Sequence, residues 1–360
     1  MSTISFARGI PAPECLPLEE LADCAHTAIE RDGRTVLSYG SPAGYQPLRE
    51  WLAERHDVDP ARVFVTNGSL QGFVFLATHF AREGRVLVEA PTYDRPLKIL
   101  AELGATVGAV PQDEEGLDVD ALEAELDAAP AALLYTIPTF QNPSGRTLGG
   151  DRRRRLIGLA RERGLLIYED DPYGLVRFEG APEPSLFELA GGEGVIYSSS
   201  FSKTVAPGAR VGYFVLPPEL ARAIEAAAVS TYITPALLAH ATVYEFVRRG
   251  SFEPNLERVR ALLGARRDAM LDALERELSG RASWSTPEGG YFLWLELPVD
   301  AEELLREAEQ AGVTFVKGTD FFLPDAGGRQ AARLAFSFAS PDEIREGASR
   351  LAALLSAGVA

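Results

Sequence analysis

Residues 197–212 read YSSSFSKTVAPGARVG, and a single lysine, Lys203, stands in this run of small and hydroxyl-bearing side chains. Lysines mostly occupy exposed polar surface. A lysine in this setting either lies in a surface loop or has a lowered pKa that makes it a nucleophile able to form a Schiff base. Arg210 follows it and offers a guanidinium that can bind a phosphate. The motifs elsewhere in the chain decide between these two alternatives.

Short apolar runs alternate with helical patterns on both sides of this stretch. Five runs are typical of buried strands: RVLVEAP (85–91), ALLYTIP (132–138), GLLIYEDD (164–171), VIYSSS (195–200) and GYFVL (212–216). Helical patterns such as residues 117–129 and 150–164 separate them. This alternation predicts a mostly parallel sheet with helices on both faces. Such sheets bind ligands at the carboxyl ends of their strands.

Polar clusters stand at three of these predicted strand ends, namely EAPTYD (89–94), TIPTFQNPSG (136–145) and YEDDPYG (168–174). The adjacent acids of the third cluster could bind a metal or pair with a cofactor. The sequence supports a metal poorly, because no histidine lies near these acids. In TNGSLQGFVFLATHF (66–80), Asn-Gly is a hairpin signal, but the apolar helical pattern after it predicts a helix start. Free N–H groups there form an anion site.

The C-terminal part has a different pattern. Residues 236–277 predict long helices, and YFLWLEL (291–297), VTFVKG (313–318) and ARLAFSF (332–338) alternate apolar and polar residues, which predicts a half-exposed sheet. An amphipathic helix is expected near the N-terminus. We therefore expect residues 1–35 to pack on a small α+β domain of residues 256–360, with a large domain of residues 36–255 that binds the ligand.

The composition limits the class of partner. The net charge of −17 argues against nucleic acid and anionic membranes, and the four arginines at 152–155 are expected to form a solvated helix face. Two cysteines give no disulfide framework and no metal-ligand spacing, which favours a reducing compartment. Without a recognisable signal or a membrane-spanning run, the chain is expected to be cytoplasmic and to hold no metal.

SSSFSKTVAPGARVG, IPTFQNPSG and YEDDPYG together resemble the fold-type I pyridoxal-phosphate enzymes. The similarity is to class I/II aminotransferases of the 2-aminoadipate and kynurenine aminotransferase subgroup, and it extends from ISFARGIPAPE to ARLAFSFAS. It implies an α/β fold with a large domain on a mostly parallel seven-stranded sheet and a smaller α+β domain. It also implies pyridoxal 5'-phosphate as cofactor and a homodimer with shared active sites.

The same resemblance assigns the catalytic residues. Lys203 is expected to form the Schiff base with the cofactor and then to move the substrate proton. Asp170 is expected to pair with the pyridine nitrogen and so keep the ring an electron sink, whereas Asp171 is expected to point elsewhere. Tyr173 and Asn142 match the residues that hydrogen-bond the phenolic oxygen of the cofactor.

Further cofactor contacts follow from the resemblance. Tyr93 matches the aromatic residue that stacks on the ring. The phosphate is expected to be bound by Gly68, Ser69, Leu70, Ser200 and Arg210, and Ser202 completes the cofactor-binding set. Tyr39 matches a tyrosine that reaches the phosphate of the neighbouring subunit, with Tyr45 as the competing candidate.

Substrate contacts are expected from Arg333, Gly9 and Asn142. Arg333 matches the arginine that binds the substrate α-carboxylate, and a two-pronged contact of this kind orients the Cα–H bond relative to the ring. Gly9 matches a position that lines the substrate pocket. Arg8 either contacts a distal acidic group of the substrate or faces solvent, and exchange of Arg8 for alanine would distinguish these alternatives.

The resemblance predicts an aminotransferase that moves an amino group from an L-amino acid to a 2-oxo acid, with 2-oxoglutarate as the expected acceptor. A lyase, racemase or cyclase could use the same site residues, because the outcome depends on which bond is aligned and where the proton returns. A stand-alone effector domain of a transcriptional regulator is the third alternative, and the acidic charge disfavours it.

Overall fold

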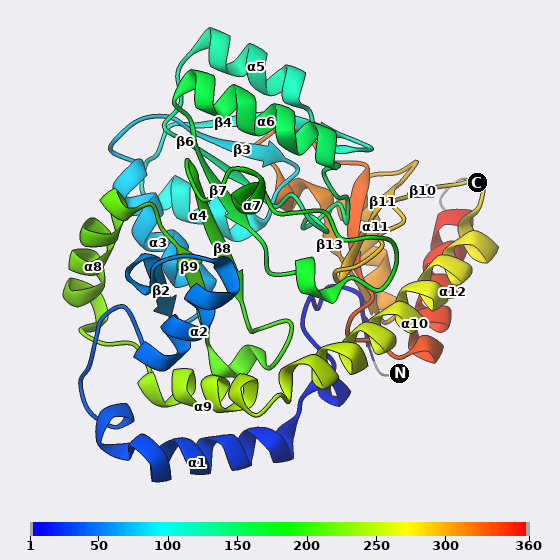
Figure 1. The fold of residues 1–360 in the computed structure, drawn as a ribbon. Helices are drawn as coiled ribbons and strands as arrows, with labels where there is room; N and C mark the ends of the chain where they lie inside the picture. The colour runs from blue at the N-terminus through cyan, green and yellow to red at the C-terminus, as the bar shows by residue number, and fades with distance from the viewer. Residues whose placement is uncertain (1–2, 358–360) are drawn as a thin grey trace.

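The computed structural model describes residues 3–357, and Figure 1 shows their arrangement. The central element is a large sheet with the strand order β2-β9-β8-β7-β6-β3-β4-β5. Its strands are β2 (Val63–Thr66), β3 (Val86–Ala90), β4 (Val107–Asp113), β5 (Gly116–Leu117), β6 (Leu133–Thr136), β7 (Leu166–Asp170), β8 (Val195–Ser200) and β9 (Gly212–Val215). The pairings are parallel from β8 through β7, β6 and β3 to β4, while β9 runs antiparallel to its two neighbours.

The sheet confirms the predicted parallel α/β architecture, with one correction to the number of strands. Within residues 3–357 it has eight strands, not seven, because β5 folds back on β4 and pairs Gln112 with Leu117. The β5 strand has only two residues and lies at the edge of the sheet. Strands β2, β3, β6, β8 and β9 are buried almost throughout, as expected for strands covered on both faces, whereas only two of the seven residues of β4 are buried.

The helices that connect the strands of the large sheet, together with α8 after β9, form two groups. One group contains α3 (Ser69–Phe80), α4 (Asp94–Glu102) and α8 (Pro218–Tyr232); the other contains α5 (Val119–Ala128), α6 (Gly150–Arg163) and α7 (Leu186–Leu189). The remaining helix here, α2 (Gln46–His56), packs beside β2. Local signals define their ends: the Asp118 carboxylate caps the start of α5, and α6 ends at Gly164, whose φ is +65°.

The arginine run at the start of α6 is only partly a solvated face. Arg152 and Arg155 pair with acids of neighbouring segments. Arg153 is completely buried, and its guanidinium donates to the carbonyl oxygens of Leu148 and Pro138. The prediction was wrong for Arg153, because buried carbonyl oxygens in the connection between β6 and α6 need hydrogen-bond donors inside the fold.

The second part of the chain carries a smaller sheet with the order β10-β11-β14-β13 and long helices. Its strands are β10 (Ser283–Trp284), β11 (Phe292–Glu296), β13 (Val316–Lys317) and β14 (Ala331–Ala335), and its helices are α9 (Leu237–Arg248), α10 (Phe252–Leu278), α11 (Ala301–Gln310) and α12 (Pro341–Ala357). Short 3-10 helices are η1 (Pro13–Cys15), η2 (Pro60–Arg62), η3 (Gly174–Val176), η4 (Pro207–Ala209) and η5 (Gly318–Phe321).

The predicted half-exposed sheet is wrong for the central strands. Every residue of β14 is buried, and so are four of the five residues of β11. Leu334 and Leu293 join the main core, while Arg333 and Phe292 line a cavity shared with strand ends of the large sheet. The polar side chain of Arg333 therefore marks a wall of a binding cavity and not a solvent-facing side.

The N-terminal residues contact two separate elements of the second part of the chain. Strand β1 (Ile4–Ser5) pairs in parallel with β12 (Val313–Thr314), and α1 (Leu18–Val36) packs along α9 (Figure 1). The predicted boundary between residues 255 and 256 falls inside the continuous helix α10, and the division into three segments stays a prediction. None of the helices in residues 3–357 has the length and apolar character needed to cross a membrane.

Candidate active site

A cavity of about 420 Å³ collects most of the residues predicted from the motifs. The predicted residues in its wall are Gly9, Ser69, Leu70, Tyr93, Asn142, Asp170, Tyr173, Ser200, Ser202, Lys203, Arg210 and Arg333. They come from the ends of β6, β7 and β8, the start of α3 and α4, strand β14 and the N-terminal segment. A larger cavity of about 600 Å³, which Arg146, Trp284 and Glu288 help to line, has none of these residues in its wall.

Lys203 lies just beyond β8, as its position after VIYSSS predicts. Its ammonium donates a hydrogen bond of 2.7 Å to the carbonyl oxygen of Gly9 and lies 5.0 Å from the ring centroid of Tyr291. Burial lowers the pKa of Lys203 to about 8, and the charges of Arg333 and Arg210 contribute to the lowering. A neutral amine, which is the nucleophilic form, is therefore accessible near neutral pH.

Asp170 ends β7 on the neighbouring strand. Its Oδ2 accepts a hydrogen bond of 2.7 Å from the hydroxyl of Tyr135, and its Oδ1 is buried without a partner among the described residues. Burial raises the pKa of Asp170 to about 7, the bond from Tyr135 lowers it, and the nearby Asp171 carboxylate raises it. Asp171 points elsewhere, as predicted: its oxygens accept from the Gly174 amide and the Tyr197 hydroxyl.

The start of α3 has the features of an anion site. Gly68 precedes the helix with a φ of +92°, so the predicted helix start, and not a hairpin, is confirmed. A Cβ at Gly68 would collide with the guanidinium of Arg210. Arg210 donates to the carbonyl oxygens of Pro207 and Asn67, and Ser200 shares a hydrogen bond of 2.8 Å with Ser202. The helix amides, the two hydroxyls and the guanidinium suit a phosphate.

Arg333 reaches from β14 across to the large sheet. Its Nη1 donates a bond of 3.0 Å to Oδ1 of Asn142, and its Nη2 donates a bond of 3.0 Å to the carbonyl oxygen of Ala7. Its Nε is buried and has no partner among the described residues. A buried guanidinium with an unpaired N–H is suited to a carboxylate ligand.

The remaining predicted residues lie outside the cavity wall. Tyr39 is 81% exposed, whereas its competitor Tyr45 is buried and donates to the Asp32 carboxylate. Arg8 is exposed, and its guanidinium lies 5.0 Å from the ring centroid of Phe338 beside a different cavity. The structure thus does not bring Arg8 to the cavity that contains Lys203.

Several residues of the wall were not predicted from the motifs: Ile10, Phe73, Asp94, Arg95, Pro96, Tyr135, Ile137, Tyr168, Pro172, Pro207 and Phe292. Many of them lie within one or two residues of a predicted one, so neighbourhood in the motif was the available signal. For Tyr135 the sequence shows only that it stands near the end of a predicted buried strand, and its place beside the strand that carries Asp170 comes from the fold.

These features fit pyridoxal 5'-phosphate. The unpaired Oδ1 of Asp170 can accept a hydrogen bond from a protonated ring nitrogen. The start of α3 can bind the phosphate, and the amine of Lys203 can react with the aldehyde. The unpaired Nε of Arg333 leaves a place for a substrate carboxylate.

Comparison with known proteins supports this assignment. Residues 14–351 match the family model of aminotransferase class I and II. The 2-aminoadipate transaminase of Thermus thermophilus is 41% identical over 97% of this chain and 89% of its own. The aromatic-amino-acid aminotransferase 1 of Thermococcus litoralis is 35% identical, over 97% of this chain and 87% of its own.

Solved structures show the same likeness. The crystal structure of LysN, an alpha-aminoadipate aminotransferase from Thermus thermophilus complexed with N-(5'-phosphopyridoxyl)-L-leucine, matches with a TM-score of 0.94 and 39% identity. The match covers 99% of this chain and 93% of that chain. The chain therefore belongs to the class I and II aminotransferases, enzymes that use pyridoxal 5'-phosphate to transfer amino groups between amino acids and oxo acids.

Proposed function

We propose that this enzyme moves the amino group of an L-amino acid to 2-oxoglutarate at the cavity of Lys203, Asp170 and Arg333. The observation that carries this assignment is the presence in one cavity of an amine of lowered pKa, a carboxylate oxygen without a partner and a guanidinium N–H without a partner among the described residues. Each matches one part of the reaction: the cofactor aldehyde, the ring nitrogen and the substrate carboxylate.

When bound, the cofactor supplies a protonated ring that accepts electrons from the substrate Cα. Lys203 would hold the aldehyde and, as a free amine, would take the proton from the substrate Cα as a general base. Arg333 would bind the α-carboxylate and thereby orient the Cα–H bond. Asn142, which contacts Arg333, and Tyr173 would hydrogen-bond the phenolic oxygen of the cofactor. Tyr93 and Gly9 line the same cavity. Tyr93 would cover the face of the cofactor ring, and Gly9 would line the substrate side.

The phosphate assignment rests on the start of α3. We assign it to the amides of Gly68, Ser69 and Leu70, with Ser200, Ser202 and Arg210. Gly68 lets the Arg210 guanidinium approach the helix start, which a side chain at this position would prevent.

Capture of the aldehyde by the cofactor-free enzyme should depend on pH through Lys203. Its pKa is lowered from 10.5 to about 8, so the neutral amine predominates only above that pH. The capture rate should rise about tenfold per pH unit from about pH 6 and level off above about 8, as followed by stopped-flow absorbance. Because the charge of Arg333 helps to lower this pKa, Arg333→Gln should move the inflection upward. An inflection near 10.5, the ordinary value for a lysine, in the unaltered enzyme would contradict the assignment.

The reaction itself is tested with a panel of L-amino acids and 2-oxoglutarate. Donors should include 2-aminoadipate and aromatic amino acids, which the names of the relatives indicate for those proteins. Formation of glutamate together with the matching oxo acid supports amino-group transfer. Release of ammonia without glutamate, or loss of chirality alone, would instead show a lyase or a racemase at the same site.

We also propose a homodimer in which Tyr39 reaches the phosphate of the second subunit. Its support is the exposure of Tyr39 at 81%, together with the exposed apolar side chains Leu37 and Ile233. Both cysteines are free and buried, which agrees with a reducing compartment such as the cytoplasm.

Tyr39→Phe should weaken binding of pyridoxal 5'-phosphate about tenfold, because a hydrogen bond to a charged group is lost. Fluorescence titration of the cofactor-free enzyme measures this. Tyr45→Phe is the matched control, since the Tyr45 hydroxyl contacts Asp32 inside its own chain; its cofactor affinity should stay unchanged. The opposite ranking would assign the role to Tyr45.

A further inference from the structure

The hydroxyl of Tyr135 makes the only side-chain hydrogen bond that Asp170 receives among residues 3–357. Tyr135 is on β6, and its hydroxyl donates to Oδ2 of Asp170 over 2.7 Å. The other oxygen, Oδ1, is buried and unpaired within the same residues. The two oxygens of one carboxylate therefore have different surroundings, and Tyr135 determines which of them remains available.

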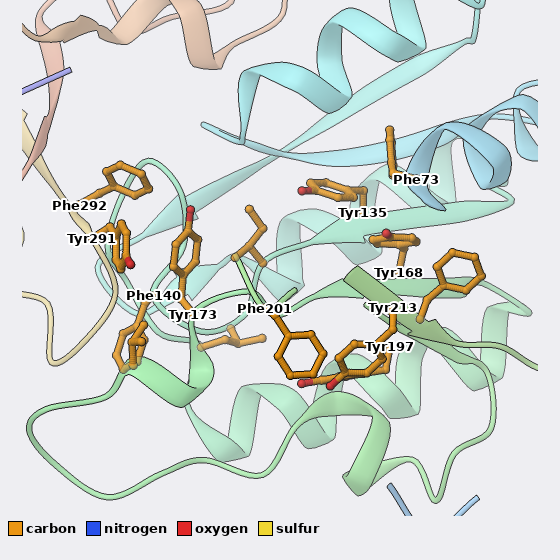
Figure 2. Close-up of a cluster of buried hydrophobic side chains, with 14 of the residues drawn as sticks. Phe73, Tyr135, Phe140, Tyr168, Tyr173, Tyr197, Phe201, Tyr213, Tyr291 and Phe292 are labelled. Carbon is orange, nitrogen blue, oxygen red and sulfur yellow. The ribbon is translucent and has the colours of Figure 1, made fainter. Parts of the chain in front are cut away.

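The ring of Tyr135 has little freedom to move. It is completely buried, and the register of β6 and β7 places it directly beside Tyr168. The two rings stack with centroids 5.5 Å apart and an interplanar angle of 30°, while Phe73 presents its edge to Tyr135 at 5.2 Å. Figure 2 shows the three rings together, with the hydroxyl of Tyr135 directed away from Phe73. The position of the donor is thus set by packing.

We propose that Tyr135 is a positioning residue for the ring nitrogen of the cofactor: it holds Asp170 by Oδ2 so that Oδ1 receives the nitrogen-bound proton. This rests on the proposed role of Asp170. Tyr135 acts on the cofactor through Asp170.

The same hydrogen bond also favours the charged carboxylate. Burial and the neighbouring Asp171 both raise the pKa of Asp170, and the bond from Tyr135 opposes them. The titratable groups that interact with Asp170 from the surrounding elements are Tyr93, Tyr135, Tyr168, Asp171 and Tyr173. Of these, only Tyr135 donates a side-chain hydrogen bond to it in the described chain. Loss of the hydroxyl should thus leave Asp170 more often neutral, and a neutral acid holds a protonated ring nitrogen poorly.

The test combines Tyr135→Phe with a cofactor analogue in which a carbon replaces the ring nitrogen. We expect Tyr135→Phe to raise the dissociation constant of pyridoxal 5'-phosphate about tenfold and that of the analogue by less than about twofold. A purely structural role of Tyr135 would weaken both by the same factor. Fluorescence titration of cofactor-free enzyme gives all four constants without any turnover.

Tyr197→Phe is the matched control, because the hydroxyl of Tyr197 donates over 2.9 Å to the adjacent carboxylate, Asp171. Tyr197→Phe should change the dissociation constants of pyridoxal 5'-phosphate and of the analogue by the same factor. If Tyr135→Phe does not fold, 3-fluorotyrosine at position 135 takes its place. 3-Fluorotyrosine keeps the shape of tyrosine, and its hydroxyl is a stronger hydrogen-bond donor. The dissociation constant of pyridoxal 5'-phosphate should therefore fall at least about twofold relative to that of the analogue. An unchanged ratio would overturn the proposal.

Borohydride reduction of the same preparations separates this inference from the proposed function. If Lys203 carries a pyridoxyl label but Tyr135→Phe changes both dissociation constants by the same factor, only the role of Tyr135 is overturned. A wild-type enzyme without that label overturns the proposed function itself.

Discussion

Lys203→Ala enzyme should lose at least about 10⁴-fold in kcat for transfer of an amino group to 2-oxoglutarate. The change removes both the amine that holds the aldehyde and the base that moves the Cα proton, and general-base catalysis alone contributes up to this amount. Coupled detection of glutamate measures it. Folding should persist, because the Lys203 amine makes a single hydrogen bond, to the Gly9 carbonyl, among the described residues.

The chain supplies a suitable control for this exchange. Its only other lysines are Lys98 and Lys317, and Lys317 is paired on the surface with Glu302 over 3.0 Å. Lys317→Ala should keep kcat within about twofold of the wild-type value. A Lys203→Ala enzyme within about tenfold of wild type would show that another group moves the proton.

Asp170→Asn should lower kcat about 10²- to 10³-fold. Asparagine keeps the shape of the side chain and can still accept from Tyr135, but it has no charge to hold a protonated ring nitrogen. The electron-accepting property of the ring should fall accordingly. Steady-state kinetics with a good amino donor measures the loss.

Asp171→Asn distinguishes this effect from general damage to the loop. The Asp171 carboxylate accepts from the Gly174 amide over 2.8 Å and from the Tyr197 hydroxyl over 2.9 Å, and it is absent from the cavity wall. Its loss should lower the melting temperature while kcat stays within about tenfold. If Asp170→Asn retains more than about a third of the wild-type kcat, the ring nitrogen is held by another group.

The apolar runs predicted where the strands end, and so where a ligand would bind. Lys203, Asp170 and Asn142 lie at or beyond the ends of such strands, and the family resemblance predicted the role of each. Arg333 was predicted from a motif as well, and the structure places it in the same cavity wall although it lies on the smaller sheet.

Other features depend on contacts between distant segments. Arg153 sits in a run of four arginines, and only the carbonyls around it in the folded chain show why it is buried. The strand β14 alternates like a half-exposed strand, yet its second face closes a cavity against the large sheet. Tyr135 looks like any strand aromatic until the pairing of β6 with β7 places it opposite Tyr168, with its hydroxyl within hydrogen-bond distance of Asp170. Local periodicity cannot report these neighbours.

The covalent bond between Lys203 and the cofactor can be detected directly. The holoenzyme is reduced with borohydride and digested, and its peptides are weighed by mass spectrometry. The chain has three lysines, and Lys98 and Lys317 both pair with acids on the surface, so a label can be assigned without ambiguity. We expect one pyridoxyl group, on Lys203. A label on Lys98 or Lys317 alone, or no label on an active enzyme, would contradict this expectation.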